Sequence, residues 1–508
     1  MSGLPTVTVS EARGYVAGPA NLDQLSVVIG CSSGGSGLSP FYLSGAAAVA
    51  GVGYGDGPDT LCQIIEQIQA SGTSRKFPSA FYKVPNTTVG AYGAIDVSGV
   101  TGTSVATVHA ATKPYGTYEA YIRVVTGCTI GVTGGTLVWS LDAGRTISQI
   151  TALGTANTFT IPNSNVQFDF AAGTLIAGDV IKVRTKAPLP GASDIDAAFA
   201  ALAVASIDFS VVVCEWPMTA ALAVHVTTGL AALRAVGKRA VAICRTKIRD
   251  FETAETEATW AAAVEADYAA FTDSNVVVRA EYGFVTDAMT ARSYLRSDLA
   301  QVAADVMRVP RSQFPDVPAD QPEANFQLVD STGATIGHDE GSRGSVTGLS
   351  DDSQGNRFWT GFRLPDFARR ENVFGTVPWV MYAADERIKN LPTRRIVNAM
   401  ERVAVSAGNS GLGSTLFYIP ADPLNPASRN QLTVPSRNAL HAKIFSALSK
   451  EFGDDIQNAN DGAIDTGLVQ INPVVTVTGG NLLSVSATLA PRVFGYLLNL
   501  SIVLAVQQ

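Results

Sequence analysis

The chain has 508 residues, of which 46% are hydrophobic and only 16% are charged, whereas soluble domains usually carry roughly 25% charged residues. Its formal net charge is −8, and its basic residues form no run longer than local pairs such as Arg369-Arg370 and Arg394-Arg395. This balance disfavours nucleic-acid binding, which needs a basic surface, and the sparse charge is typical of a surface largely covered by protein partners.

Cysteine use and the start of the chain indicate where the protein is made. The cysteines are few, odd in number and without Cys-x-x-Cys spacing, which predicts reduced, buried thiols in a reducing cytoplasm. They are Cys31, Cys62, Cys128, Cys214 and Cys244. No basic segment followed by an apolar one opens the chain, and no run of about 20 apolar residues occurs later. We therefore expect a protein made in soluble form in the cytoplasm, with no membrane insertion.

The first 93 residues are expected to form an arm and the start of a core. Residues 1–25 are the predicted N-terminal arm, which contains one alternating segment typical of a strand. That segment is Thr6, Val7, Thr8 and Val9. Residues 26–93 are the first part of an α/β core. Its predicted elements are an apolar strand at 26–30, a helix over 61–68 capped by Asp59, and a strand at 80–84.

Helix signals are scarce between residues 94 and 190, where Thr, Val and Gly are frequent. Short strand patterns recur there, separated by turn signals such as Thr133-Gly134-Gly135. The predicted strands lie at 104–109, 118–125, 136–141, 158–161 and 180–184. Strands at this spacing without helices indicate a β-sandwich or a small barrel. We expect residues 94–190 to form an outer domain inserted into the main fold.

Strands and helices alternate from residue 191 to residue 380, the expected α/β domain. Predicted helices lie at 194–204, 219–236, 252–271 and 294–307, and predicted strands at 209–214, 240–244 and 276–280. The strands are continuous apolar runs, which suits a mostly parallel sheet buried on both faces. Beyond residue 309 the pattern is less regular, with a weak strand at 326–329 and an aromatic stretch at 358–362.

The C-terminal part of the core is expected at 381–480, with helices at 391–403 and 436–451. The last segment, 481–508, has no acidic residue and predicts two apolar strands. Their principal apolar positions are Leu483, Val485, Leu489, Leu498, Leu500, Ile502 and Leu504. A terminal strand either closes its own sheet or offers its backbone N–H and C=O groups to a neighbour. We expect this segment to be a strand arm that joins subunits.

One serine motif is a catalytic candidate. Gly30-Cys31-Ser32-Ser33-Gly34 follows an apolar strand and matches Gly-x-Ser-x-Gly, in which Ser32 would be the nucleophile of a hydrolase. That role needs a helix directly after the serine. The following residues are rich in Gly, which costs ~1 kcal/mol at each helical position, so we interpret the stretch as a surface loop.

The histidines offer a second candidate site. His338-Asp339-Glu340, with Asp330 nearby, is the one cluster of acids with a histidine, but it lacks the spacing of known metal ligands and lies in a Gly/Ser-rich stretch. We interpret it as a solvated loop. His225 and His441 lie in predicted helices without an acid or a histidine at a ligand offset. No catalytic, metal-binding or cofactor-binding residue is therefore predicted.

Together these patterns predict a mixed α/β (α+β) fold: an α/β sheet domain built from N- and C-terminal parts, an inserted β-sandwich-like domain and extended terminal arms. This order of elements resembles contractile phage tail sheath proteins and the sheaths of related contractile injection systems. The closing segments Leu483–Pro491 and Leu498–Leu504 carry the resemblance most clearly. The helix at 391–403, with Arg394-Arg395 and Glu401-Arg402, is similar to the Arg-bearing helix of that family.

The resemblance implies a structural, non-enzymatic protein of the virion tail, assembled in the host cytoplasm. Its subunits would form hexameric rings that stack around a tail tube through strand exchange by terminal arms, and contraction would drive the tube through the host envelope. The implied partners are further copies of the chain, the tail tube protein, and baseplate and tail terminator proteins. Two alternatives stay open: a serine hydrolase that uses Ser32, and another virion component such as a tail adhesin.

Overall fold

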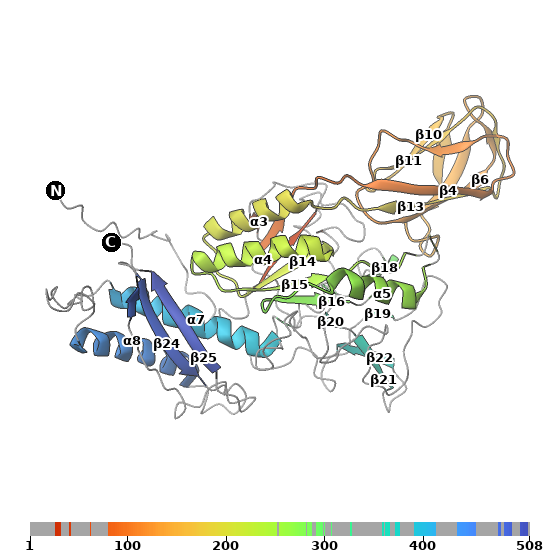
Figure 1. Cartoon of the computed structure of the whole chain (residues 1–508). Helices are drawn as coiled ribbons and strands as arrows, with labels where there is room; N and C mark the ends of the chain where they lie inside the picture. Colours follow the sequence, from red (N-terminus) through yellow and green to blue (C-terminus); the bar gives the residue numbers. More distant parts are fainter. Residues whose placement is uncertain are drawn as a thin grey trace, which may run out of the picture.

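The computed structural model contains three groups of elements that lie in a row (Figure 1). It describes residues 26–31, 40–41, 61, 80–250, 253, 255–280, 282–286, 291–297, 299, 306, 326–327, 358–359, 361–365, 371–375, 391–412, 434–453, 476–478, 482–489 and 498–505. A group of short strands stands at one end, a sheet flanked by helices in the middle, and two helices with a small sheet at the other end. Helices thus combine with parallel and antiparallel sheets, as predicted at that coarse level.

The central sheet has seven strands in the order β2-β3-β1-β14-β15-β16-β20. The strands are β1 (Ser26–Gly30), β2 (Pro40–Phe41), β3 (Ala80–Lys83), β14 (Val211–Pro217), β15 (Val241–Arg245), β16 (Val276–Arg279) and β20 (Phe358–Trp359). All neighbours run parallel except β2, which is antiparallel to β3. Every residue of β1 and β15 is buried, as expected for strands covered on both faces. The predicted parallel sheet is confirmed.

Three helices pack on one face of this sheet: α3 (Ala192–Val204), α4 (Ala220–Ala235) and α5 (Glu257–Tyr268). The side chains of Thr219 and Thr256 cap α4 and α5 by accepting hydrogen bonds from the backbone N–H groups of the first turn. Helix α3 crosses α4 closely at Gly229, where a Cβ atom would lie 2.2 Å from Cγ of Phe199. Only glycine permits that approach.

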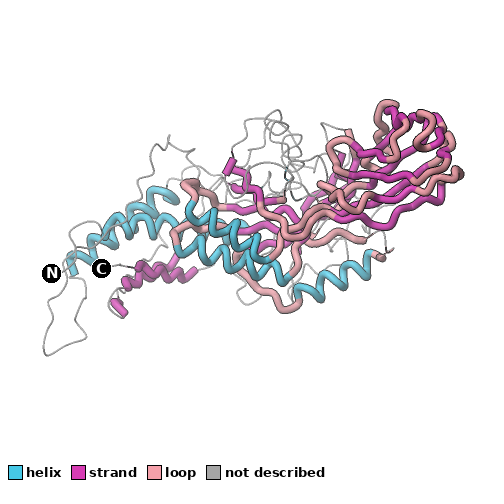
Figure 2. Tube along the Cα trace, turned by 90° about the horizontal axis from the view of Figure 1, so that it is seen from above, coloured by secondary structure: helices cyan, strands magenta, loops and turns pink. Residues whose placement is uncertain are grey.

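The strands between β3 and α3 form separate sheets and, seen from above, project from one end of the central part (Figure 2). We call residues 91–186 the β-rich segment. Its strands are β4 (Ala91–Gly99), β5 (Ala106–Val108), β6 (Glu119–Thr126), β7 (Cys128–Thr129), β8 (Gly135–Ser140), β9 (Thr151–Gly154), β10 (Thr158–Ile161), β11 (Val166–Phe170), β12 (Thr174–Leu175) and β13 (Val180–Lys186). They form a five-stranded sheet, β4-β13-β6-β8-β9, a three-stranded sheet, β10-β11-β5, and the pair β12-β7.

The five strands predicted in this segment are present, but β4, β7, β9, β11 and β12 were not predicted. Strand β4 pairs with β13 yet has no buried residue, so it lacks the alternation of apolar and polar residues that marks a half-buried strand. The segment has a hydrophobic core of its own, around Ile122, Phe168 and Ile181. That residues 94–190 form an outer domain inserted into the main fold stays a prediction.

The two ends of the β-rich segment are hydrogen-bonded to each other and to the central part. The backbones of Thr88 and Leu189 exchange hydrogen bonds of 3.1 and 2.9 Å. The carboxylate of Asp194 accepts bonds from the N–H of Thr87 at 2.8 Å, from its hydroxyl at 2.6 Å and from the N–H of Gly191 at 2.8 Å. Entry and exit of the segment are therefore fastened to the first turn of α3.

A third connection corrects one of the predictions. The helix expected over 294–307 does not begin at Tyr294, because Ser293–Arg296 is strand β18, paired with β17 (Gly283–Thr286). Tyr294 is buried in the core of the β-rich segment, and the N–H of Ser293 donates to the carboxylate of Asp142 at 3.1 Å. Contacts with a segment about 150 residues away thus override the local helical pattern; helix is described only at Leu299 and Val306.

Helix α5 also begins later than predicted, at Glu257 instead of residue 252. The carboxylate of Glu255, two residues before the helix, accepts bonds from the N–H of Asp250 and from Lys247, and neither Asp250 nor Glu255 is helical. The predicted helix over 61–68 and its cap, Asp59, lie outside the described residues apart from Leu61, which is helical and buried.

The last described group consists of two helices and a sheet: α7 (Leu391–Leu412), α8 (Val434–Gly453), β23 (Thr476–Thr478), β24 (Leu482–Leu489) and β25 (Leu498–Ala505). Both helices are confirmed and exceed their predicted bounds. The short strands β19 (Phe326–Gln327), β21 (Gly361–Pro365) and β22 (Glu371–Gly375) complete the described elements. Within the described parts of the chain, no helix has the length and apolar character that a membrane crossing needs.

Candidate assembly surface

The C-terminal sheet contains the residues that the sequence marks for assembly. Strands β24 and β25 are antiparallel neighbours over eight residue pairs, from Leu482 opposite Ala505 to Leu489 opposite Leu498. The predicted apolar positions occupy matching places in this register, such as Leu483 opposite Leu504 and Val485 opposite Ile502; Leu500 lies opposite Ala487. The structure therefore pairs the two arm strands with each other inside one chain. Their role between subunits stays a prediction, and Thr6, Val7, Thr8 and Val9 lie outside the described residues.

The order of this sheet leaves one long edge. Its strands run β23-β24-β25, and among the strands that the structure describes β25 has a single neighbour, β24. Strand β25 is eight residues long, Leu-Asn-Leu-Ser-Ile-Val-Leu-Ala, and carries no charged residue, proline or glycine. Natural edge strands usually contain charges, prolines or bulges that prevent pairing with another chain. Strand β25 has none of these features.

Helix α7 packs against β25 and joins the C-terminal group to the central sheet. Nε of Arg394 donates to Oδ1 of Asn275, in the loop before β16, at 2.7 Å, and Nε of Arg239, in the loop before β15, donates to Oε2 of Glu401 at 2.9 Å. Arg234 of α4 lies 3.8 Å from the same carboxylate oxygen. Positions 394, 398 and 401 share one face of the helix, which explains how they reach the same surface.

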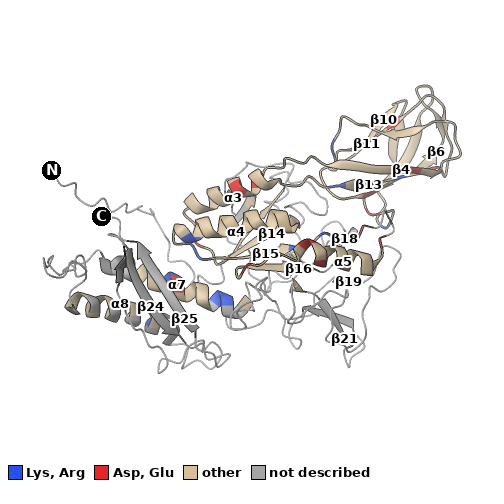
Figure 3. Cartoon of the chain, viewed as in Figure 1, with Lys and Arg blue, Asp and Glu red and all other residues tan. Residues whose placement is uncertain are grey.

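Burial shapes the charges at this contact, which is visible as blue and red on α7 in Figure 3. Burial, together with the nearby Arg234, lowers the pKa of Arg394 to about 10, although Glu401 and Asp273 act in the opposite direction. Burial likewise lowers the pKa of Arg239, and Glu401 opposes that effect. Glu401 is thus the carboxylate that offsets the charge of these arginines. The contact fixes α7 on the core and thereby positions the sheet that carries β25.

Asn275, Arg234 and Arg239 were not predicted as members of this contact. Each lies more than 100 residues from α7 in the sequence, and nothing in its own surroundings marks it. The signal available was on α7 itself, where Arg394, Asn398 and Glu401 interrupt the face that also carries Val397 and Met400. Polar residues among buried positions of a helix require partners, which indicates a contact with another element.

The other candidates from the sequence separate into those described and those not. Ser32, the cluster His338-Asp339-Glu340 and Asp330 lie outside the described residues. His441 lies in α8, as predicted, and the two histidines whose side chains are described each meet an acid from a different element. Nδ1 of His109 lies 2.7 Å from Asp169, and Nδ1 of His225 lies 2.9 Å from Asp196 on α3. Both are pairs of one histidine with one acid near the surface. Within the described residues, no group of three or more His, Cys, Asp or Glu side chains is placed to hold a metal ion.

The described cysteines are buried thiols outside any disulfide, as predicted; they are Cys31, Cys128, Cys214 and Cys244, and Cys62 lies outside the described residues. Burial raises the pKa of the Cys214 thiol, and its hydrogen bond with Cys244 acts in the same direction. Burial also raises the pKa of Cys128. Because the thiolate is the nucleophile, neither thiol is primed for catalysis.

Comparison with known proteins gives likenesses of structure only. The crystal structure of a sheath tail protein from Desulfitobacterium hafniense aligns with 95% of this chain and 96% of its own, at 11% identity and a TM-score of 0.43. The cryo-EM structure of the anti-feeding prophage baseplate aligns with 64% of this chain and 73% of its own, at 11% identity and a TM-score of 0.32. No family model and no curated protein matches the chain. At this identity and these TM-scores, neither likeness assigns a function.

Proposed function

We propose that the chain is a structural subunit of a contractile tail sheath, and that the edge of β25 is where one subunit joins the next. The observation that carries the proposal is the uncharged eight-residue strand with a neighbour on one side only among the described strands. A strand from a neighbouring subunit that pairs there would satisfy the N–H and C=O groups of that edge. The predicted N-terminal arm, with Thr6–Val9 as its strand, is the proposed donor.

Strand addition suits a contractile lattice for a physical reason. Main-chain hydrogen bonds do not depend on which side chains meet, so a paired arm tethers two subunits while their globular parts rotate and repack. Rings of six subunits stacked around a tail tube would stay connected through such arms. The energy for contraction would come from the additional surface buried when an extended packing changes to a compact one, as in other two-state assemblies. No nucleotide is needed for that step.

The β-rich segment is the proposed outward-facing part of the subunit. The antiparallel bridge between Thr88 and Leu189 brings entry and exit of the segment together, so a short linker can replace it. Its core is separate from the one beneath α3, α4 and α5. Assembly through β25 should therefore not require residues 91–186. Baseplate and terminator proteins are the proposed partners at the two ends of the sheath, in a virion tail.

Two deletions of the full chain test the proposal together. The first removes residues 482–508, and the second replaces residues 91–186 by a short Gly/Ser linker. The proposal expects rings or tubes from the intact chain and from the linker variant, and only dispersed subunits from the C-terminal deletion. Electron microscopy and sedimentation velocity measure the outcome, and circular dichroism shows whether each variant is folded. Tubes of normal length from a folded 482–508 deletion would refute the joining role of these strands.

A further inference from the structure

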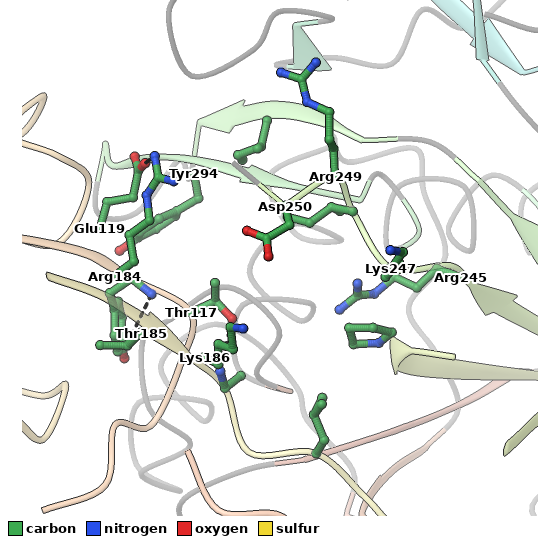
Figure 4. Close-up of a pocket in the computed structure, with 16 residues that line it drawn as sticks. Thr117, Glu119, Arg184, Thr185, Lys186, Arg245, Lys247, Arg249, Asp250 and Tyr294 are labelled. Carbon is green, nitrogen blue, oxygen red and sulfur yellow. Dashed lines mark hydrogen bonds and ion pairs between the residues drawn. The ribbon is translucent and has the colours of Figure 1, made fainter. Parts of the chain in front are cut away.

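A cavity of about 320 Å³ lies where the β-rich segment meets the carboxyl ends of the central parallel strands (Figure 4). One wall is formed by the ends of β14 and β15, at Pro217 and Arg245, and by the loop after β15. The opposite wall is formed by the start of β6 and the end of β13, with Lys186 at its rim. In open α/β sheets, ligands bind outside the carboxyl ends of the strands near the point where the strand order reverses, which here lies between β1 and β14.

The charge of the lining is opposite to that of the whole chain. Five of the lining residues are basic and two are acidic, which gives five minus two, a formal charge of +3, in a chain of net charge −8. The basic residues are Arg184, Lys186, Arg245, Lys247 and Arg249, and the acidic ones are Glu119 and Asp250. Basic side chains from both walls surround the space in Figure 4. A concave site with an excess of one sign of charge concentrates ligands of the opposite sign.

One of the two acids is already engaged by arginines. Glu119 accepts a bond from Nη2 of Arg184 at 3.0 Å through one oxygen and from Nη1 of Arg145 at 3.1 Å through the other. Deep in the opposite wall, Nε of Arg245 donates to Glu215 at 3.0 Å, with the two side chains 1% and 7% exposed. Glu119 therefore offsets part of the charge of Arg184 and Arg145, and Glu215 offsets that of Arg245, whose buried guanidinium has a fixed position.

The wall formed by the loop after β15 is held in place by its own contacts. The indole N–H of Trp260 donates to the carbonyl of Lys247 at 2.8 Å, and the N–H of Asp250 donates to the carboxylate of Glu255 at 2.9 Å. Lys247 in turn lies 3.2 Å from the other carboxylate oxygen of Glu255. The loop thus has a defined shape, which a binding site requires before its ligand arrives.

Apolar side chains make up the remainder of the lining, and they decide which kind of anion fits. Leu189, Pro217, Ile248 and Leu295 come from four separate segments and line the same space. The volume of the cavity lies at the lower end of the range for small-molecule sites, about 300–1,000 Å³. A bare inorganic anion would leave this apolar surface uncovered, whereas a neutral apolar molecule would make no use of the basic rim.

We propose that this cavity binds a small organic anion, a carboxylate on an apolar body, with the carboxylate at Lys186 and Lys247 and the body against Leu189 and Ile248. The ligand would contact the β-rich segment and the central part at once, and so stabilise their relative orientation. This site is separate from the edge of β25, and its occupancy is measurable whether or not subunits assemble.

Equilibrium dialysis of the full chain with radiolabelled octanoate tests the proposal. We expect saturable binding of one octanoate per chain, at least tenfold weaker for Lys186→Glu, and unchanged for Lys182→Glu. Lys182 is the matched control, because it is also exposed on β13 but does not line the cavity. Octanol and inorganic phosphate serve as competitors, and each should displace octanoate poorly. Equal affinity of the two lysine variants, full displacement by octanol, or full displacement by phosphate would each overturn the proposal.

Discussion

Replacing Glu401 by Gln tests whether α7 fastens the C-terminal sheet to the core. The substitution keeps the shape of the side chain but removes the charge that Arg239 meets at 2.9 Å and Arg234 at 3.8 Å. Breaking a fully buried ion pair by removing one partner costs about 3–5 kcal/mol, and breaking an exposed pair costs about 0.2–1 kcal/mol. Glu401 and Arg239 are 14% and 13% exposed, so the expected cost lies between these limits, at about 2 kcal/mol.

Hydrogen exchange followed by mass spectrometry measures this cost at the helix itself, because a chain with several cores does not unfold in a single step. A loss of about 2 kcal/mol corresponds to roughly 30-fold faster exchange of the protected amides of α7. The control is Asp196→Asn, which also removes one carboxylate charge, but from an exposed pair with His225, whose side chains are 36% and 49% exposed. The free energy of opening that hydrogen exchange measures in α3 and α4 should fall by less than about 1 kcal/mol in this variant. Exchange in α7 of Glu401→Gln within about threefold of the parent chain would refute the anchoring role, since that corresponds to less than about 0.7 kcal/mol.

Three further predictions concern the fold. Gly229→Ala should lower the free energy of opening of α3 and α4, measured by hydrogen exchange, by about 1–3 kcal/mol, because the added Cβ meets Phe199 and this outweighs the gain of about 1 kcal/mol in helix propensity. Gly134→Ala, where the nearest atom lies at 3.9 Å, is the control and should change little. Asp142→Ala should lower the stability of the contact between the β-rich segment and β18 by about 2–3 kcal/mol and raise hydrogen exchange in β18. The reason is that this fully buried carboxylate accepts bonds from Ser140, Thr146 and Ser293. Unchanged protection of β18 would contradict this prediction. Burial raises the pKa of Asp194, but its bonds with Thr87 and Gly191 outweigh that effect and leave it below the ordinary value. A group with a depressed pKa stabilises the fold above its unfolded pKa of about 3.9, and that contribution is lost as the pH falls through its folded pKa. Asp194→Asn should therefore lower the hydrogen-exchange protection factors of α3 at pH 7 and flatten their fall below about pH 4. Equal slopes in the variant and the parent chain would count against this role.

The sequence was informative where burial and local signals agree. Strand β1 is a continuous apolar run and α4 begins directly after a threonine cap, and both were located to within a residue or two. It failed where a distant segment decides the structure. Tyr294 follows a helical pattern but forms a strand because its ring is buried in the β-rich segment, and β4 has no buried face to reveal it.

The same distinction applies to the sites. The apolar positions of β24 and β25 were predicted because alternation is local, and they occupy matching places in the observed register. The cavity was not predicted, because Lys186 ends strand β13 and Lys247 lies in the loop after β15, so the fold alone brings them to one cavity. The partner of His225 was missed for a similar reason, since Asp196 comes from the neighbouring helix and not from an i, i+4 position.

The measurement that tests the central claim most directly is negative-stain electron microscopy of the purified full-length chain over a range of concentrations. If subunits join by strand addition at β25, six-fold rings and striated tubes should appear and should grow longer with concentration. Dispersed single subunits at every concentration, with the chain folded by circular dichroism, would contradict the account.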